Sequence, residues 1–140
     1  MERTIEVLVI DDEPSVADAL KMILEDHSYE VVVAVTGREG IEQARRQRFD
    51  VTLTDMRLPD MTGVDVINAI CQENLCDSVI LITAYGTPET IVTARTCGAS
   101  SVLAKPFRPS DILEEISSLL IARGVSGGIH RSSPLTIECG

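Results

Sequence analysis

The strongest constraint on the fold of this chain is a repeated alternation between short aliphatic runs and segments with helical periodicity. The first run, residues 5–10, is too continuously apolar for a strand that exposes one face to water. Runs of this kind are typical of strands that are buried on both faces of a parallel sheet. The predicted strands are residues 5–10, 30–35, 50–54, 78–82 and 101–104.

Start and stop signals bracket the helical segments between these runs. A proline suits the first turn of a helix, as at Pro14, and Thr36 with Glu39 has the capping-box form that opens a helix running to about Arg46. Glycine in a C-terminal cap position, as at Gly98, ends a helix. The predicted helices start at Pro14, Gly37, about Val64, Pro88 and Pro109, and the last one stops at Gly124.

Five strand and helix repeats predict an α/β fold with a parallel sheet, helices on both faces and right-handed crossovers. Five strands are too few for a closed barrel of eight, so an open, doubly wound sheet is expected. Residues 1–124 are predicted to form this one domain. Residues 125–140 are rich in Ser and Gly and poor in apolar residues, which predicts a flexible tail or a linker stub.

Polar residues directly follow or end four of the five predicted strands. Asp11 and Asp12 follow the first strand, Asp55 the third, Thr83 the fourth and Lys105 the fifth. In an open α/β sheet, ligands bind in the crevice outside the carboxyl ends of the strands. The sequence therefore places three acids, a hydroxyl and a cation at the edge where a ligand is expected.

Three carboxylates in one crevice repel one another unless a cation lies among them or one of them is protonated. An open site of this kind suits Mg²⁺, whereas softer metals lack the His or Cys ligands that they prefer. Lys105 and Thr83 could hold the oxygens of a transferring phosphoryl group. Asp55 is the best-placed nucleophile, because a loop rather than a helix follows it.

The motifs taken together resemble the receiver domains of bacterial two-component response regulators, from about Ile5 to Arg123. Their joint order and spacing carry the resemblance, since each motif alone is only suggestive. The matching segments are VLVIDDEP at residues 7–14, LTDMRLPDMTG at residues 53–63, LITAYG at residues 81–86 and GASSVLAKPF at residues 98–107.

The resemblance implies a flavodoxin-like fold with five helices and the strand order 2-1-3-4-5. It also implies that Asp55 is the phosphoacceptor. The implied Mg²⁺ ligands are Asp11, Asp12, Asp55 and the backbone carbonyl of Arg57. The implied phosphoryl-binding groups are Thr83, the backbone N–H of Ala84 and Lys105.

The resemblance implies a phosphorelay switch that is not a turnover enzyme, although it catalyses its own phosphorylation and dephosphorylation. The implied donor is a phosphohistidine on a sensor histidine kinase or a phosphotransfer protein, because neither His27 nor His130 lies at the active edge. The implied receiver of the signal is an output protein or an output domain. A homodimer through the fourth helix, fifth strand and fifth helix is a further implied partner.

Three details near the site also follow from the resemblance. The bond between Lys105 and Pro106 is expected to be cis. Arg57 and Tyr85, each two residues beyond a site residue, are expected to tune the lifetime of the phosphate. Val102 departs from the family, because many receivers carry Tyr or Phe there as an aromatic switch.

The formal net charge of −10 should repel nucleic acid phosphates and anionic lipids, so direct binding to either is not expected. The start of the sequence has no basic and long apolar leader, and no apolar run reaches the length needed to span a bilayer. The expected location is therefore the cytoplasm.

Two other function classes remain open from the residues. A receiver-like interaction module without phosphorylation would keep only the fold, and the intact set of site residues argues against it. An Asp-nucleophile phosphatase resembling the haloacid dehalogenases would need a second Asp two residues after Asp55, where this chain has Arg57. Taken alone, Asp11 and Asp12 also suit a simple helix cap.

Overall fold

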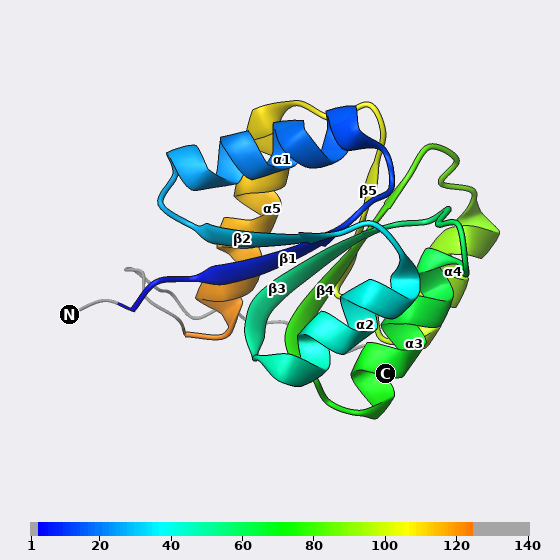
Figure 1. The fold of residues 1–140 in the computed structure, drawn as a ribbon. Coiled ribbons are helices and arrows are strands. Elements are labelled where there is room, and N and C mark those ends of the chain that lie inside the picture. The colour runs from blue at the N-terminus through cyan, green and yellow to red at the C-terminus, as the bar shows by residue number, and fades with distance from the viewer. Residues whose placement is uncertain (1–2, 125–140) are drawn as a thin grey trace.

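The computed structural model describes residues 3–124, which form five strands and five helices in strict alternation (Figure 1). The predicted tail, residues 125–140, lies outside the described residues. The strands are β1 Glu6–Ile10, β2 Glu30–Ala34, β3 Phe49–Asp55, β4 Cys76–Thr83 and β5 Ser101–Ala104. The helices are α1 Pro14–Asp26, α2 Gly37–Arg46, α3 Gly63–Gln72, α4 Pro88–Thr96 and α5 Pro109–Ala122. Between residues 3 and 124, none of the helices has the length and apolar character required to traverse a bilayer.

All strand pairs are parallel, and the sheet order is β2-β1-β3-β4-β5. This order confirms the doubly wound α/β fold that the sequence predicts. The chain moves outward from β1 to one edge and then crosses to β3, β4 and β5. The connection after β1 and the connection after β3 therefore run over opposite faces of the sheet. This reversal opens a crevice at the carboxyl ends of β1 and β3.

Two separate apolar cores cover the two faces of the sheet. Alternate residues of β1 belong to different cores, because successive side chains of a strand point to opposite faces. Leu8 and Ile10 pack with α2, α3 and α4, whereas Val7 and Val9 pack with α1 and α5. Figure 1 shows α1 and α5 together on one side of the sheet and α2 and α3 on the other.

Two strands begin earlier than the sequence pattern indicates. Phe49 opens β3 and Cys76 opens β4, and the two residues pair with each other across the ladder. Phe49 is fully buried, and polar Asp50 and Asp77 follow the two residues directly. The predicted third strand starts at Asp50 and so misses only Phe49, whereas Asp77 interrupts the apolar pattern and places the predicted start of the fourth strand at residue 78.

The capping box predicted at the start of α2 forms only in part. The Thr36 side chain accepts a hydrogen bond from the Glu39 N–H at 3.0 Å, as predicted. Glu39 Oε1 accepts from the Val35 N–H at 3.1 Å, one residue before the cap. A complete capping box forms instead at α3, between Thr62 and Asp65, where the sequence has Asp in place of the usual Glu.

Gly63 brings the start of α3 against the backbone of the third strand. Its N–H donates to the carbonyl of Met56 at 2.7 Å. A Cβ atom at Gly63 would lie 2.4 Å from the carbonyl oxygen of Asp55 and 3.0 Å from Cα of Met56. The absence of a side chain at residue 63 therefore allows the loop after Asp55 to close directly on that residue.

We expect Gly63→Ala to lower the free energy of unfolding by about 1–3 kcal/mol, because backbone atoms must move to admit the methyl group. Gly86→Ala is the matched control. Its Cβ would make an ordinary 3.6 Å contact with Thr83 Cγ2, and the expected change is within about 0.5 kcal/mol. Urea denaturation of both variants measures the difference, and equal stabilities would contradict this account of Gly63.

Candidate functional site

The structure brings the five site residues predicted from the strand ends to one edge of the sheet. Asp11 and Asp12 directly follow β1, and Lys105 directly follows β5. Asp55 is the last residue of β3 and Thr83 the last of β4. A cavity of about 340 Å³, here called the acidic cavity, opens at this edge, and its lining includes four of the five residues.

Three carboxylates form the centre of this site. One oxygen from each of Asp11, Asp12 and Asp55 lies within 4.8 Å of the others. Asp11 is 1% exposed and Asp55 is 9% exposed, whereas Asp12 is exposed. The cluster therefore combines two buried carboxylates, Asp11 and Asp55, with the exposed carboxylate of Asp12.

Lys105 supplies positive charge to the cluster. Its Nζ atom lies 3.1 Å from Asp55 Oδ1 and 4.0 Å from Asp11 Oδ2. Burial lowers the pKa of Lys105, but the hydrogen bond and charge of Asp55, together with the charge of Asp11, outweigh burial and raise it above its usual value. The ammonium is therefore held in its charged form beside Asp55.

Asp11 is the most perturbed acid of the site. Burial raises its pKa from 3.8 to about 6, and the nearby charge of Asp55 acts in the same direction. Its Oδ1 atom accepts from the Glu13 N–H at 2.9 Å. That hydrogen bond agrees in part with the interpretation of Asp11 as a helix cap, although the N-cap residue of α1 is Glu13.

The other oxygen of Asp11 identifies what the cluster lacks. Asp11 Oδ2 is buried and has no hydrogen-bond partner among residues 3–124. A buried carboxylate oxygen without a hydrogen bond is costly, and the charge of three carboxylates exceeds that of the Lys105 ammonium. A hard cation that prefers oxygen ligands fits both features, so the residues present suit Mg²⁺.

Thr83 and Ala84 stand at the end of β4, which β3 separates from β1 and Asp12. Thr83 is 2% exposed, and its Oγ1 atom accepts from the Tyr85 N–H at 3.1 Å. The Lys105 N–H donates to the Thr83 carbonyl at 2.8 Å, which joins the ends of β4 and β5. The peptide bond between Lys105 and Pro106 is cis, as expected from the family resemblance.

A contact between Arg57 and Tyr85 was not predicted. The Arg57 guanidinium carbon lies 5.9 Å from the centre of the Tyr85 ring, within the range of a cation–π interaction. Both residues line the acidic cavity, and Tyr85 is 69% exposed. Sequence reasoning identified each residue separately, but no local pattern links two residues on different loops.

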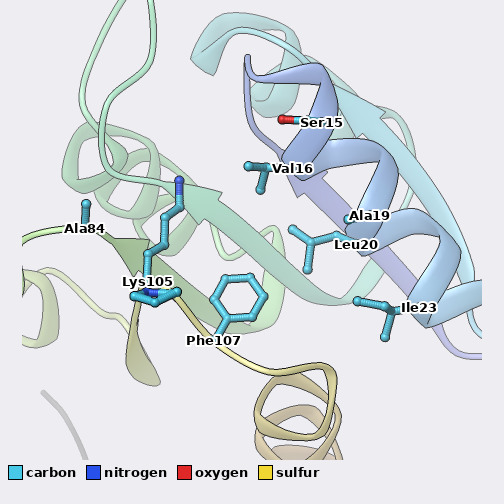
Figure 2. Close-up of a pocket in the computed structure, with 9 residues that line it drawn as sticks. Ser15, Val16, Ala19, Leu20, Ile23, Ala84, Lys105 and Phe107 are labelled. Carbon is cyan, nitrogen blue, oxygen red and sulfur yellow. The ribbon is translucent and has the colours of Figure 1, made fainter.

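A second, apolar groove adjoins the acidic cavity and was also not predicted. It has a volume of about 490 Å³ and lies between α1 and the segment that follows β5. Figure 2 shows Leu20 and Ile23 of α1 on one side of the groove and Phe107 on the other. Ala84 and Lys105 line both the groove and the acidic cavity, so the two sites are adjacent.

A family model described as the response regulator receiver domain matches residues 7–117. The probable transcriptional regulatory protein TcrX of Mycobacterium tuberculosis is 37% identical over 120 residues, which cover 86% of this chain and 51% of that protein. The transcriptional regulatory protein ZraR of Escherichia coli is 38% identical over 103 residues, which cover 74% of this chain and 23% of that protein. The chain thus spans about half of the first relative and less of the second.

Solved structures show the same fold. A CheY-like response regulator receiver domain protein from Methanospirillum hungatei has a TM-score of 0.79 and 33% identity, and the match covers 84% of this chain and 94% of that one. The chemotaxis protein CheY4 of Vibrio cholerae has a TM-score of 0.81 and 31% identity, with 84% and 100% covered. Strand order and fold class are therefore confirmed independently of the sequence pattern.

The raised pKa of Asp11 predicts how the stability of the metal-free protein depends on pH. Because the folded pKa of about 6 exceeds the ordinary 3.8, the folded state holds this proton more tightly than the unfolded chain. The resulting stabilisation is present at low pH and is lost as the pH rises to about 6. Asp11→Asn removes the charge and should be more stable than the wild type by about 3 kcal/mol at pH 7.5.

Urea denaturation of the wild type and Asp11→Asn in chelator, between pH 4.5 and 7.5, measures this difference. We expect the advantage of the variant to shrink as the pH falls through about 6, because the Asp11 carboxyl of the folded wild type then takes up a proton and no longer buries a charge. A variant that is no more stable than the wild type at pH 7.5 would show that the buried carboxylate costs nothing.

Proposed function

The chain belongs to the response regulator receiver domain family, and from this premise we propose that it is a two-component signalling switch that accepts a phosphoryl group on Asp55. The observation that carries the assignment to Asp55 is its position at the open edge of the sheet, with Lys105 Nζ 3.1 Å from its Oδ1 atom. A carboxylate held beside a fixed cation is positioned to attack a phosphorus atom as charge develops on the phosphoryl oxygens.

The proposed reaction is transfer from a phosphohistidine. A carboxylate oxygen of Asp55 forms a bond to phosphorus, the bond from phosphorus to the histidine nitrogen breaks, and the imidazole leaves. The product is an aspartyl phosphate. Later attack by water returns the free carboxylate and inorganic phosphate, so the chain acts as a switch with a lifetime and not as a turnover enzyme.

The neighbouring side chains have proposed roles in holding the phosphoryl oxygens. Lys105 provides an ammonium that its surroundings keep charged. Thr83 provides a buried hydroxyl and Ala84 an exposed backbone position at the cavity. Arg57 and Tyr85 contact each other beside these groups, which supports a role in controlling how water reaches the phosphate.

The proposed metal is Mg²⁺, held by the carboxylates of Asp11, Asp12 and Asp55 and by the backbone carbonyl of Arg57. When bound, it neutralises charge on the carboxylates and on the phosphoryl oxygens. The Oδ2 atom of Asp11 supports this ligand set, because it has no hydrogen bond among residues 3–124 and lies 4.0 Å from Lys105 Nζ, so a cation would satisfy it.

The proposed donor is a sensor histidine kinase or a histidine phosphotransfer protein, which meets the chain in the cytoplasm. The donor is proposed to dock on the apolar groove beside α1 of this chain, because the groove and the acidic cavity share Ala84 and Lys105. A donor protein seated there would hold its phosphohistidine next to Asp55.

The signal is proposed to leave through α4, β5 and α5, toward an output protein or output domain, or into a homodimer. Val92 on α4 is 64% exposed and Ile121 on α5 is 44% exposed, which supports a contact surface on these helices. Val102 on β5 is half-buried against the core. The aromatic rotamer change of many receivers therefore has no counterpart at this residue.

Incubation with Mg²⁺ and acetyl phosphate should add the mass of one phosphoryl group to the wild type and none to Asp55→Asn. Asparagine keeps the size of the side chain but is a far weaker nucleophile. Intact-protein mass spectrometry measures the difference. A wild type that gains no mass would favour an interaction module that keeps the receiver fold without phosphorylation.

Ala19→Glu should slow phosphoryl transfer from a protein donor but not from a small-molecule donor. Ala19 is exposed on α1 and lines the groove, so a new carboxylate there places a charge against an apolar docking partner. We expect at least about a tenfold slower transfer from a phosphorylated kinase that serves the wild type. Phosphorylation by acetyl phosphate should be unchanged, and an equal loss with both donors would contradict the docking assignment.

A further inference from the structure

The loop between β3 and α3 is fastened to the N-terminus of α2 by one side chain. Asp60 Oδ1 accepts from the Gly37 N–H at 2.8 Å, and Asp60 Oδ2 accepts from the Arg38 N–H at 2.9 Å. These are the first two N–H groups of α2, which have no partner within their own helix. The two hydrogen bonds hold the pKa of Asp60 below its usual value, so the carboxylate is charged at neutral pH.

An apolar contact fastens the same loop at the same place. A Cβ atom on Gly37 would lie 2.4 Å from Met61 Cγ and 2.6 Å from Met61 Sδ. The Met61 side chain therefore lies directly on the backbone of Gly37. Adjacent residues of one loop thus contact the start of α2 through a polar and an apolar side chain.

The base of the loop is fastened as well. The Gly63 N–H donates to the Met56 carbonyl, and the Leu58 N–H donates to the Met61 carbonyl at 3.2 Å. Arg57 pairs with Thr62 in an isolated antiparallel bridge. Arg57 is therefore held between the end of β3 and a loop tip that α2 fixes.

We propose that Asp60 is a positioning residue that orients the Arg57 carbonyl by fastening its loop to α2, and thereby sets the affinity of the carboxylate cluster for Mg²⁺. The inference rests on the proposed function, since it assigns a role to the Arg57 carbonyl. Asp60 itself is not among the residues that line the acidic cavity. Its effect is therefore transmitted through the loop.

Thr36 provides a matched control on the same helix. Its side chain accepts from the Glu39 N–H, the third free donor of α2, and its removal weakens that helix without loosening the loop. Isothermal titration calorimetry with MgCl₂ should show about a tenfold weaker affinity for Asp60→Ala than for the wild type. Thr36→Ala should bind Mg²⁺ within about twofold of the wild type, because the hydrogen bond that it removes joins Thr36 to its own helix and not to the loop.

A second variant separates positioning from simple loss of negative charge. Asp60→Asn keeps one carbonyl oxygen as an acceptor and removes the charge. If Asp60 acts by positioning the loop, Asp60→Asn should bind Mg²⁺ with an affinity between those of the wild type and Asp60→Ala. A purely electrostatic effect predicts that the two variants weaken binding equally, and that result would overturn the proposal.

Hydrogen exchange gives a readout that does not depend on phosphorylation. Because coupling between two sites is reciprocal, Mg²⁺ should slow exchange of the Gly37 and Arg38 amides in the wild type. Unchanged exchange on Mg²⁺ addition, unchanged affinity in Asp60→Ala, or an equal loss in Thr36→Ala would each overturn the role of Asp60. A wild type that fails to bind Mg²⁺ at all would instead count against the metal site of the proposed function.

Discussion

The mutual repulsion of three carboxylates at the end of a buried sheet is the constraint on which the rest of this structure depends. Asp11, Asp12 and Asp55 are brought together by strands whose side chains lie in two apolar cores, so they cannot move apart without disturbing those cores. Lys105 offsets part of the repulsion, and the buried Oδ2 atom of Asp11 remains without a hydrogen bond. In the proposed function, the same crowding of carboxylates that would destabilise the metal-free protein would favour a bound cation.

Two loops, one after β3 and one after β4, border the carboxylate cluster. The loop after β3 closes on Asp55 through Gly63 and reaches α2 through Asp60. The loop after β4 carries Tyr85, which contacts Arg57 on the opposite loop. Asp55 therefore lines a cavity between these two loops, and this cavity shares Ala84 and Lys105 with the apolar groove where the proposed donor would dock. A change in how these loops meet is a direct way for chemistry at Asp55 to alter the shape of the surface.

The sequence predicted what depends on local pattern. Apolar periodicity identified five strands and five helices, and the strand ends identified the residues that share one edge, because the topology of a parallel sheet fixes which ends meet. The starts of β3 at Phe49 and of β4 at Cys76 were missed, the second because Asp77 interrupts the apolar run. The contacts of Asp60 with α2 and of Arg57 with Tyr85 were also missed, because each joins residues on separate segments and depends on loop conformations that no local pattern specifies. The roles assigned to the site residues remain predictions.

The most direct test of the central claim is to locate the phosphoryl group on the chain. After phosphorylation in the presence of Mg²⁺, borohydride reduction converts an aspartyl phosphate to homoserine, and peptide mass mapping then identifies the altered residue. The account predicts homoserine at residue 55 and unchanged aspartate at residues 11 and 12. Homoserine at residue 11 or 12, or phosphate on a residue other than aspartate, would contradict the assignment of Asp55 as the acceptor.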